Sequence, residues 1–237
     1  MHESDRILLE CDNVSKQYGF FFALNKISFK VEENTTFGIV GANGAGKTTL
    51  INILSGLNSP SSGKILVNGM DYKENNRDIK RLIGTISSKS FLYEELSIFE
   101  NLKFYSKLFS VYDKDEFKKE VEHLTETFSL SEWIYEPINY LSTGMKQKVE
   151  IIRTLIHNPS ILFLDEPFSG LDFNSINLLI KILNDLRKNK KLTIVITSHK
   201  IELIQKMSDA VLILKRGKIS KIVPKTEMRT INIESYF

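Results

Sequence analysis

The feature that most limits what this chain can fold into is a glycine-rich stretch, Gly41-Ala42-Asn43-Gly44-Ala45-Gly46-Lys47-Thr48. It fits the pattern G-x-x-x-x-G-K-[ST], and residues 36–40 before it read as a short buried strand while residues 47–54 read as a helix. Glycines let such a loop curl so that several backbone N–H groups face one anion, and the helix N-terminus adds its positive dipole end. The sequence therefore predicts a phosphate-binding loop between a strand and a helix.

Two side chains at the end of this stretch suit a bound nucleotide. We expect Lys47 to hold the β- and γ-phosphates and Thr48 to give its hydroxyl to Mg²⁺, as the last position of this motif does in P-loop NTPases. The candidate nucleotide-binding residues of the loop are Gly41, Asn43, Gly44, Ala45, Gly46, Lys47, Thr48 and Thr49.

Composition limits the partners of the chain. Lys and Arg number 32 against 29 Asp and Glu, and a dispersed net charge of +3 is too small to indicate a nucleic-acid footprint. The single cysteine, Cys11, excludes an internal disulfide and a cysteine-rich zinc site. A length of 237 residues suits one domain with room for an inserted subdomain.

We expect no segment of the chain to cross a membrane. The longest apolar runs without glycine are five residues long, at 20–24 and 210–214, whereas a spanning helix needs roughly 20 residues. Residues 1–6 are polar and lack the apolar stretch of a signal peptide. These features predict a cytoplasmic protein whose membrane contact, if any, goes through another chain.

The first half of the chain reads as β-structure followed by helices. Ile27, Phe29 and Val31 alternate with polar residues, which is typical of an antiparallel sheet edge. A capping box at Ser97 to Glu100 begins a helical region. The expected strands are residues 7–14, 23–31, 64–67 and 82–87, the β-region reaching about residue 72, and helices begin at residues 97, 113 and 144.

The second half alternates strands and helices. A strand over 161–166 ends in Asp165 and Glu166, and a strand over 192–197 leads to Ser198-His199. Parallel strands place their carboxyl ends at the edge where ligands bind, and adjacent acids there are costly unless they are solvated or bind a cation. We expect one acid to face a metal ion and the other a water. A helix over 172–188 and a hairpin of 210–214 with 218–223 complete the pattern.

Three further candidates also have ordinary interpretations. Tyr18 precedes the phosphate loop and can stack on adenine, but its spacing alone favours a strand-end tyrosine. Ser142 at a helix start is in most proteins an N-cap that satisfies its own backbone. A lone histidine such as His199 is more often structural than functional.

Taken together, these motifs resemble those of the nucleotide-binding subunit of an ABC transporter over residues 7–223. Residues 41–48 correspond to the Walker A loop, and Asp165 with Glu166 ends the Walker B strand. The remaining matches are Ser142-Thr143-Gly144 at the signature, Ser169-Gly170-Leu171-Asp172 at the D-loop, His199 at the switch histidine and Tyr18 at the adenine-stacking position.

The resemblance implies an α/β fold, the ABC ATPase fold: a P-loop NTPase core with an antiparallel β-subdomain and an inserted α-helical subdomain. Within a single domain over 1–237, the core and β-subdomain are expected at 1–87 and 158–223. The helical subdomain with the signature is expected at 88–157, and a C-terminal tail at 224–237.

The resemblance also implies an ATP hydrolase that uses Mg²⁺. Glu166 would polarise the attacking water, His199 would touch the γ-phosphate, and Asp165 would hold the metal together with Thr48. Such a reaction is phosphoryl transfer to water, driven by positioning and charge neutralisation.

Partners follow from the same resemblance. Two subunits, identical or different, would pair head to tail, so that ATP at Lys47 of one is closed over by Ser142 and Gly144 of the other, with Asp172 in the adjoining D-loop. A separate transmembrane permease would hold the pair at the cytoplasmic face of the membrane, and no nucleic-acid partner is expected.

Two positions depart from the commonest family pattern. Leu141-Ser142-Thr143-Gly144-Met145 replaces Leu-Ser-Gly-Gly-Gln, a variant similar to exporter-type subunits, including the heme exporters of cytochrome c maturation. We therefore expect export. Ser88 stands where most members carry a Gln that reaches the metal and water; the shorter side chain is expected to leave that position to a water.

Two other classes of protein are alternatives to a transporter subunit. A soluble ABC-type ATPase acting on nucleic acid or ribosomes usually has two cassettes, a long coiled-coil insertion or zinc cysteines, and this chain has one P-loop and one Cys. A P-loop kinase or GTPase would not need the signature-like helix or His199. A neighbouring gene for a membrane protein with six spans would favour the transporter.

Overall fold

The computed structural model describes residues 6–87 and 90–236. Its centre is a sheet of mainly parallel strands in the order β10-β9-β3-β8-β7-β6, where only β10 runs antiparallel to its neighbour. All five residues of β3, β7 and β8 are buried, as expected for strands covered on both faces. The strands are β3 (Thr36–Val40), β6 (Ile83–Ile86), β7 (Ile161–Asp165), β8 (Thr193–Thr197), β9 (Ala210–Lys215) and β10 (Lys218–Pro224).

A second, antiparallel sheet has the order β2-β1-β4-β5. Ile27, Phe29 and Val31 are buried and their polar neighbours are exposed, so the predicted alternation is confirmed. The buried face packs on β3 and on α1 (Lys47–Leu54), and the rings of Phe29 and Phe37 stack 5.2 Å apart between the two sheets. These strands are β1 (Ile7–Tyr18), β2 (Phe21–Glu32), β4 (Ser62–Val67) and β5 (Met70–Asp71).

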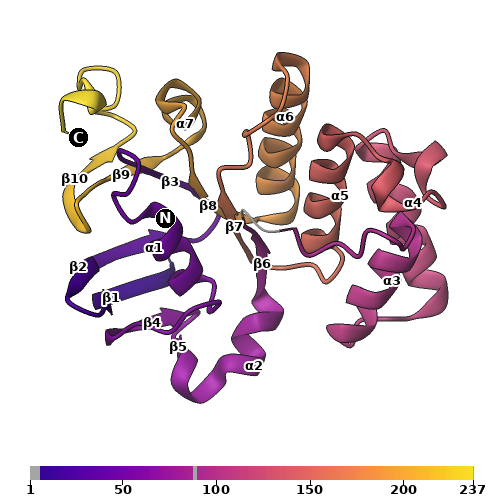
Figure 1. The fold of residues 1–237 in the computed structure, drawn as a ribbon, viewed down its shortest axis with the longest axis horizontal. Coiled ribbons are helices and arrows are strands. Elements are labelled where there is room, and N and C mark those ends of the chain that lie inside the picture. Colours follow the sequence, from indigo (N-terminus) through magenta and orange to yellow (C-terminus); the bar gives the residue numbers. More distant parts are fainter. Residues whose placement is uncertain (1–5, 88–89, 237) are drawn as a thin grey trace, which may run out of the picture.

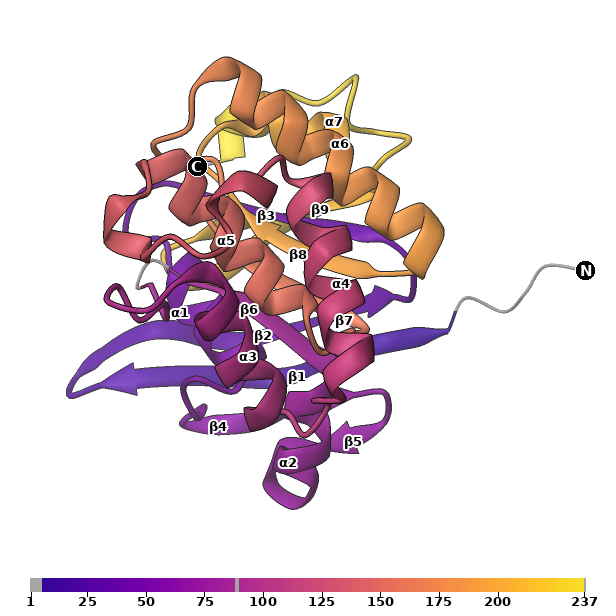
Figure 2. The ribbon, with the colours of Figure 1, turned by 90° about the vertical axis from the view of Figure 1, so that its right-hand side faces the viewer.

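Three helices form a separate group on one side of the central sheet (Figures 1 and 2): α3 (Ile98–Leu108), α4 (Lys114–Thr127) and α5 (Thr143–Leu155). The predicted capping box is confirmed, because Ser97 and Glu100 bond each other's backbone N–H. Asp113 and Ser142 cap the next two helices. Two further helices, α6 (Phe173–Lys190) and α7 (Ile201–Met207), flank the sheet. No helix in the described part of the chain is long and apolar enough to span a bilayer.

The structure corrects the expected pattern at two places. Residues 72–82 form the helix α2 (Tyr72–Leu82), so Leu82 ends a helix and does not begin a strand. This helix is almost entirely polar and only Ile79 is buried, which leaves no apolar periodicity to detect. The tail is also ordered into the fold: Met228 and Ile233 are buried, although their surroundings carry no readable pattern.

A buried histidine links the end of α5 to β6. The His157 ring stacks on Phe109 with centroids 3.9 Å apart, and its Nε2 lies 2.8 Å from the Ile83 carbonyl oxygen, to which it must donate. Its Nδ1 is buried and has no hydrogen-bond partner among the described residues. Burial lowers the pKa of His157 to about 4, so the ring is neutral in the folded chain at neutral pH.

We predict that acidification destabilises the protein through His157. The folded-state pKa of about 4 lies below the ordinary value of 6.5, so between these values the unfolded chain binds a proton that the folded chain does not. The stabilisation is complete above pH 6.5 and is lost as the pH falls towards 4, by about 2 kcal/mol at pH 5.

Urea unfolding at pH 7.5 and pH 5 measures this difference. The variant His157→Gln keeps a donor for the Ile83 carbonyl but does not titrate, so it should lose that part of the pH dependence. If the variant responds to pH as the wild type does, His157 is not the responsible group.

Candidate nucleotide-binding site

The register of the parallel strands brings the predicted site residues to one sheet edge. Thr197, the last residue of β8, lies beside Ile39 of β3 on one side and Asp165 of β7 on the other. The phosphate loop follows β3, Glu166 follows β7 and Ser198-His199 follows β8, so all three segments leave the sheet at the same edge. This is where a sheet of this topology binds its ligand.

The phosphate loop packs against strands β9 and β2, which leave no room for a side chain at Gly41 or Gly46. A Cβ on Gly41 would lie 2.3 Å from the Leu214 carbonyl oxygen of β9, and one on Gly46 would lie 2.7 Å from the Ala23 carbonyl oxygen of β2. Gly46 is also the N-cap residue of α1, and its φ of 108° is a left-handed conformation that favours glycine. Packing of the loop therefore requires glycine at positions 41 and 46, whereas Gly44 has open space around it and is favoured only by its positive φ of 77°.

Lys47 lies folded over this loop. Its side chain is buried, and Nζ donates to the carbonyl oxygens of Gly41 at 2.8 Å and Ala42 at 3.3 Å. The ammonium group is thereby held against the backbone of the loop, and Lys47 is itself the first residue of α1, whose N-terminus favours an anion.

The other loop candidates differ in exposure. Asn43, Gly44 and Thr48 are exposed and Thr49 is half-buried. Ala45 is buried, and its N–H donates to the Ala42 carbonyl, so in this structure Ala45 shapes the loop.

A hydroxyl that the motifs did not indicate organises the two acids. Thr197 Oγ1 donates to Asp165 Oδ1 at 2.7 Å and accepts from the Glu166 N–H at 3.0 Å. Thr197 and Asp165 are both buried. The only signal in the sequence was a threonine at the end of a predicted strand, and its pairing with Asp165 depends on strand order, which the motifs do not give.

Glu166 and His199 contact each other directly. Glu166 Oε2 lies 2.9 Å from His199 Nδ1 and accepts from the His199 N–H at 3.2 Å. Glu166 has a φ of 51°, a left-handed conformation that is unfavourable for a residue with a side chain and is held here by the bond to Thr197. The two residues were expected to act on the water and on the phosphate separately, and the structure pairs them.

The chemistry of this edge fits Mg²⁺ bound together with a nucleotide. Thr48 offers an exposed hydroxyl at the start of α1, which packs against β7, and Asp165 offers a carboxylate at the end of β7. Mg²⁺ is commonly held by one or two protein oxygens plus phosphates and waters. Within the described residues no three His, Cys, Asp or Glu side chains form a metal cluster, and Ser88 lies outside those residues.

Tyr18 lies near the phosphate loop but outside the core. In the β1–β2 hairpin, Lys16 pairs with Leu24, which borders Gly46, and Tyr18 lies two residues further towards the hairpin end. The ring is 49% exposed, and Lys16 Nζ is 5.2 Å from its centroid. An exposed aromatic face at this position is able to stack on a base.

The remaining candidates lie at helix starts away from the phosphate loop. Ser142 caps α5 through a 3.3 Å bond from the Met145 N–H, and its side chain is exposed. Asp172 caps α6 by accepting from Asn174 and Ser175, and the bond from the Ser175 hydroxyl is the main reason that its pKa is lowered. Gly144 is half-buried beside Leu171. Figure 1 shows α1 and α5 well apart in the molecule.

Family comparisons place this geometry among known proteins. The ABC transporter family model matches residues 24–169. A second model, an AAA domain described as a putative AbiEii toxin of a type IV toxin–antitoxin system, matches residues 134–205.

Curated relatives cover most of the chain. An uncharacterized ABC transporter ATP-binding protein of Methanocaldococcus jannaschii, MJ1023, is 38% identical over 89% of this chain and 75% of its own length. The methionine import ATP-binding protein MetN of Clostridioides difficile is 33% identical over 91% and 68%. The bacitracin transport ATP-binding protein BcrA of Bacillus licheniformis is 32% identical over 95% and 72%.

Solved structures agree with these relatives. An ATP-binding subunit of an ABC transporter superposes with a TM-score of 0.86 at 27% identity, covering 97% of both chains. A dimeric ATP-binding cassette, MJ0796, in a post-hydrolysis state with ADP and Pi, has a TM-score of 0.83 at 25% identity, covering 92% of this chain and 99% of its own. The chain therefore belongs to the ABC transporter family as an ATP-binding subunit, and it is an ATP hydrolase.

Proposed function

We propose that two cassettes of this kind close head to tail on ATP and drive a substrate through a separate permease. The observation that carries the proposal is the exposed Ser142 cap of α5, which lies apart from the phosphate loop of its own chain. A helix start with an exposed hydroxyl and N–H groups favours an anion, and a second subunit would bring its nucleotide there. Among similar structures, the ATP-binding cassette MJ0796 is dimeric in its post-hydrolysis state with ADP and Pi, which supports pairing of two cassettes.

Within each site we assign the chemistry to groups at the sheet edge. The loop N–H groups and Lys47 bind the phosphates, and Tyr18 stacks on the adenine. Glu166 takes the proton of the attacking water as the water oxygen bonds to the γ-phosphorus and the bond to the ADP oxygen breaks. Held by Thr48 and Asp165, Mg²⁺ would neutralise charge on the phosphates.

The contact between His199 and Glu166 suggests how the carboxylate is aimed. His199 Nδ1 and N–H hold one carboxylate oxygen, and the Thr197 hydroxyl fixes the backbone beside it. We assign His199 to orienting Glu166 and to contact with the γ-phosphate through the remaining part of its exposed ring.

The direction that we propose for this transport is export. The relatives' names include methionine import, which gives a direction, and bacitracin transport, which gives none. The signature variant Leu141-Ser142-Thr143-Gly144-Met145 favours export by its similarity to exporter-type subunits. In that arrangement the chain is peripheral at the cytoplasmic face, and the alternative is a soluble ABC-type ATPase that acts on nucleic acid or ribosomes.

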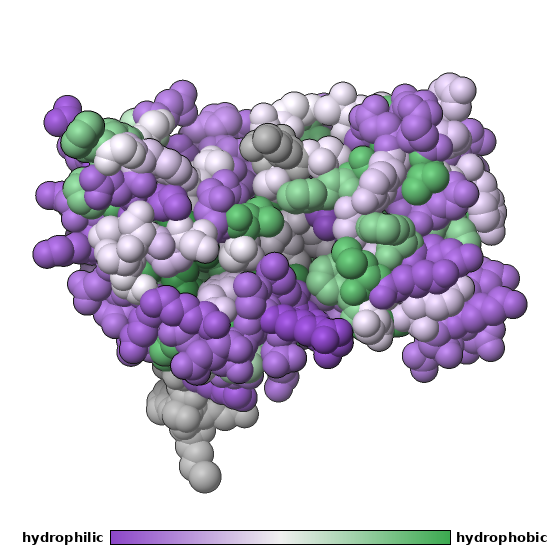
Figure 3. Space-filling model, turned by 60° about the horizontal axis from the view of Figure 1, so that its bottom comes forward, coloured by the Kyte–Doolittle hydropathy of each residue, from purple (hydrophilic) through white to green (hydrophobic). Residues whose placement is uncertain are grey.

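A surface beside α3 suits the permease. Phe91, Tyr93 and Phe104 are 38%, 49% and 40% exposed, and the rings of Tyr93 and Phe104 meet edge to face at 5.0 Å. Leu92 between them is buried and anchors the segment. Figure 3 shows hydrophobic residues gathered on the helical half of this face. We call Phe91, Tyr93 and Phe104 the docking surface, because exposed aromatic patches commonly mark partner sites.

We predict that Glu166→Gln leaves ATP binding intact and slows hydrolysis roughly a hundredfold or more, because the phosphate loop survives while the water loses its base. The slowed protein should accumulate as an ATP-bound dimer. Size-exclusion chromatography with ATP and Mg²⁺ tests this outcome, with wild type and ADP as controls. A variant that binds ATP and stays monomeric would count against the head-to-tail dimer.

We predict that Thr197→Val lowers the hydrolysis rate roughly tenfold or more and costs about 1–3 kcal/mol of stability. Valine keeps the shape but leaves a buried oxygen of Asp165 and the Glu166 N–H without their partner. Thr197→Ser keeps the hydroxyl and should behave nearly as wild type. Steady-state rates and urea unfolding on both variants test this, and equal rates in Val and Ser variants would refute the role of the hydroxyl.

For the docking surface, we predict that Phe104→Ser weakens binding of the chain to permease-containing membrane vesicles while leaving its ATPase rate in solution unchanged. Removing an exposed ring deletes apolar contact with the partner and leaves the sheet edge untouched. Ile222→Ser is the matched control, since Ile222 is 38% exposed on β10. Vesicle pelleting measures the bound fraction, and equal binding of Phe104→Ser and wild type would place the docking surface elsewhere.

A further inference from the structure

A buried ion pair lies on α5, two turns after Ser142. Arg153 Nε donates to Glu150 Oε2 at 2.8 Å, and each side chain is only 8% exposed. Burying two charges is costly, and such a pair often stabilises a fold no better than apolar residues of the same size. The role of this ion pair is therefore better judged from the residues outside α5 that it contacts than from its contribution to stability.

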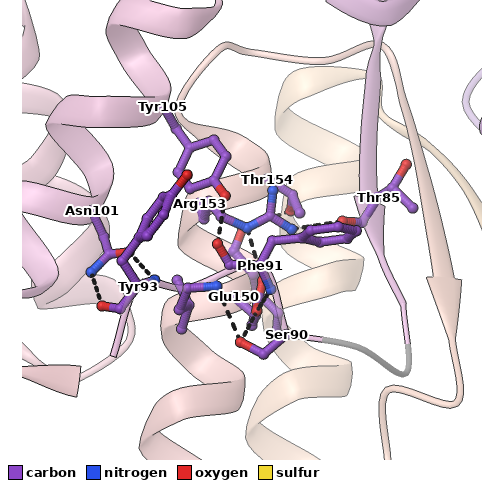
Figure 4. Close-up of polar contacts among 11 residues, drawn as sticks. Thr85, Ser90, Phe91, Tyr93, Asn101, Tyr105, Glu150, Arg153 and Thr154 are labelled. Atoms are coloured by element: carbon purple, nitrogen blue, oxygen red, sulfur yellow. Dashed lines mark hydrogen bonds and ion pairs between the residues drawn. The ribbon is translucent and has the colours of Figure 1, made fainter. Parts of the chain in front are cut away.

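Glu150 reaches from α5 to the segment before α3. Its Oε1 accepts from the Ser90 hydroxyl at 2.6 Å and from the Phe91 N–H at 2.7 Å (Figure 4). Both oxygens of the carboxylate are thus engaged, one by Arg153 and one by this segment. Charge-assisted bonds to a backbone N–H fix position more firmly than a neutral contact does.

Arg153 contacts β6, the segment that precedes α3, and α3 itself. Its Nη2 donates to the Thr85 carbonyl oxygen at 2.8 Å, on β6. Its guanidinium carbon lies 5.2 Å from the Phe91 ring centroid and 4.9 Å from that of Tyr105, whose hydroxyl donates to the Phe91 carbonyl. Figure 4 shows Arg153 placed among these rings. A planar guanidinium can stack and donate in several directions at once, which lysine cannot do.

These contacts connect three regions that the proposed function places in different roles. Thr85 lies in β6, which pairs with β7 immediately before Asp165 and Glu166. Phe91 belongs to the docking surface. Glu150 is eight residues from Ser142 on the same helix, roughly 12 Å along its axis. A helix moves as a rigid body over that length, so a shift at the pair is a shift at Ser142.

We propose that Glu150 and Arg153 are positioning residues that fasten β6 and the Ser90–Phe91 segment to α5, so that the docking surface, the end of β6 and the Ser142 cap move together. The proposal deepens the proposed function and rests on it for the roles of Ser142 and of the docking surface. Neither side chain touches the nucleotide. Their effect is on how well the Ser142 cap of their own chain meets the nucleotide bound to the partner subunit.

The variant Glu150→Gln tests this coupling. Glutamine has the same shape but only one acceptor oxygen, so it has to give up either Arg153 or the Ser90–Phe91 segment. We expect the affinity for ATP of the monomer, measured with a fluorescent ATP analogue, to change less than about twofold. We expect kcat to fall roughly fivefold or more, and ATP-induced dimerisation of the Glu166→Gln protein to weaken by a similar factor when Glu150→Gln is added.

Arg187→Gln is the matched control. It breaks a half-buried ion pair that joins α6 to Asp209, the residue directly before β9, and that includes no residue of α5. It should lower the midpoint of thermal unfolding and leave kcat per folded molecule unchanged. If Glu150→Gln behaves like this control, or keeps the wild-type kcat and dimerisation, the coupling role is refuted.

Ser90→Ala is the second variant in case Glu150→Gln does not fold. It removes one bond to Glu150 and should lower kcat about twofold or more at unchanged ATP affinity, and an unchanged kcat would refute the proposal. Failure of the proposed function has a different signature, because Glu166→Gln alone would then fail to dimerise on ATP.

Discussion

The parallel pairing of β3, β8 and β7 is the constraint on which the rest of the site depends. It sets Thr197 between Ile39 and Asp165, so that the phosphate loop, the two acids and His199 leave the sheet together. A slip of one residue in β7 or β8 would turn Asp165 or Thr197 to the other face of the sheet and displace the segments that follow them. Every residue of all three strands is buried, which ties the position of the acids to the packing of the core.

Hydrogen bonds then fix the orientation of the acidic residues that the strands bring to this edge. The Thr197 hydroxyl joins Asp165 to the Glu166 backbone, and His199 holds the Glu166 carboxylate, so the acid after β7 is fixed at both its backbone and its side chain. A left-handed residue such as Glu166 persists only where its neighbours determine it in this way. Groups fixed before the substrate arrives need no reorganisation during the reaction.

The sequence predicts much of this arrangement, and there are physical reasons why it does not predict the rest. Gly46 and Lys47 lie in a local motif whose spacing defines its own geometry, and Ser97, Asp113 and Ser142 are caps whose signals are local as well. Thr197 and the Glu150–Arg153 pair act across strands or helices, so their partners depend on tertiary contacts. The helix α2 was not predicted because a polar helix with one buried residue shows no periodic pattern of apolar residues.

The central claim is that each nucleotide site is built from two subunits, and mixing two inactive variants tests it most directly. Lys47→Ala removes the phosphate-binding cation, and Ser142→Asp keeps a good helix cap while placing a negative charge against the phosphate. A mixed dimer of the two has one site with both residues intact. The account predicts that mixing restores ATP hydrolysis to roughly a quarter of the wild-type rate, since half of the random dimers are mixed and each has one intact site. A mixture that stays as inactive as the separate variants would contradict it.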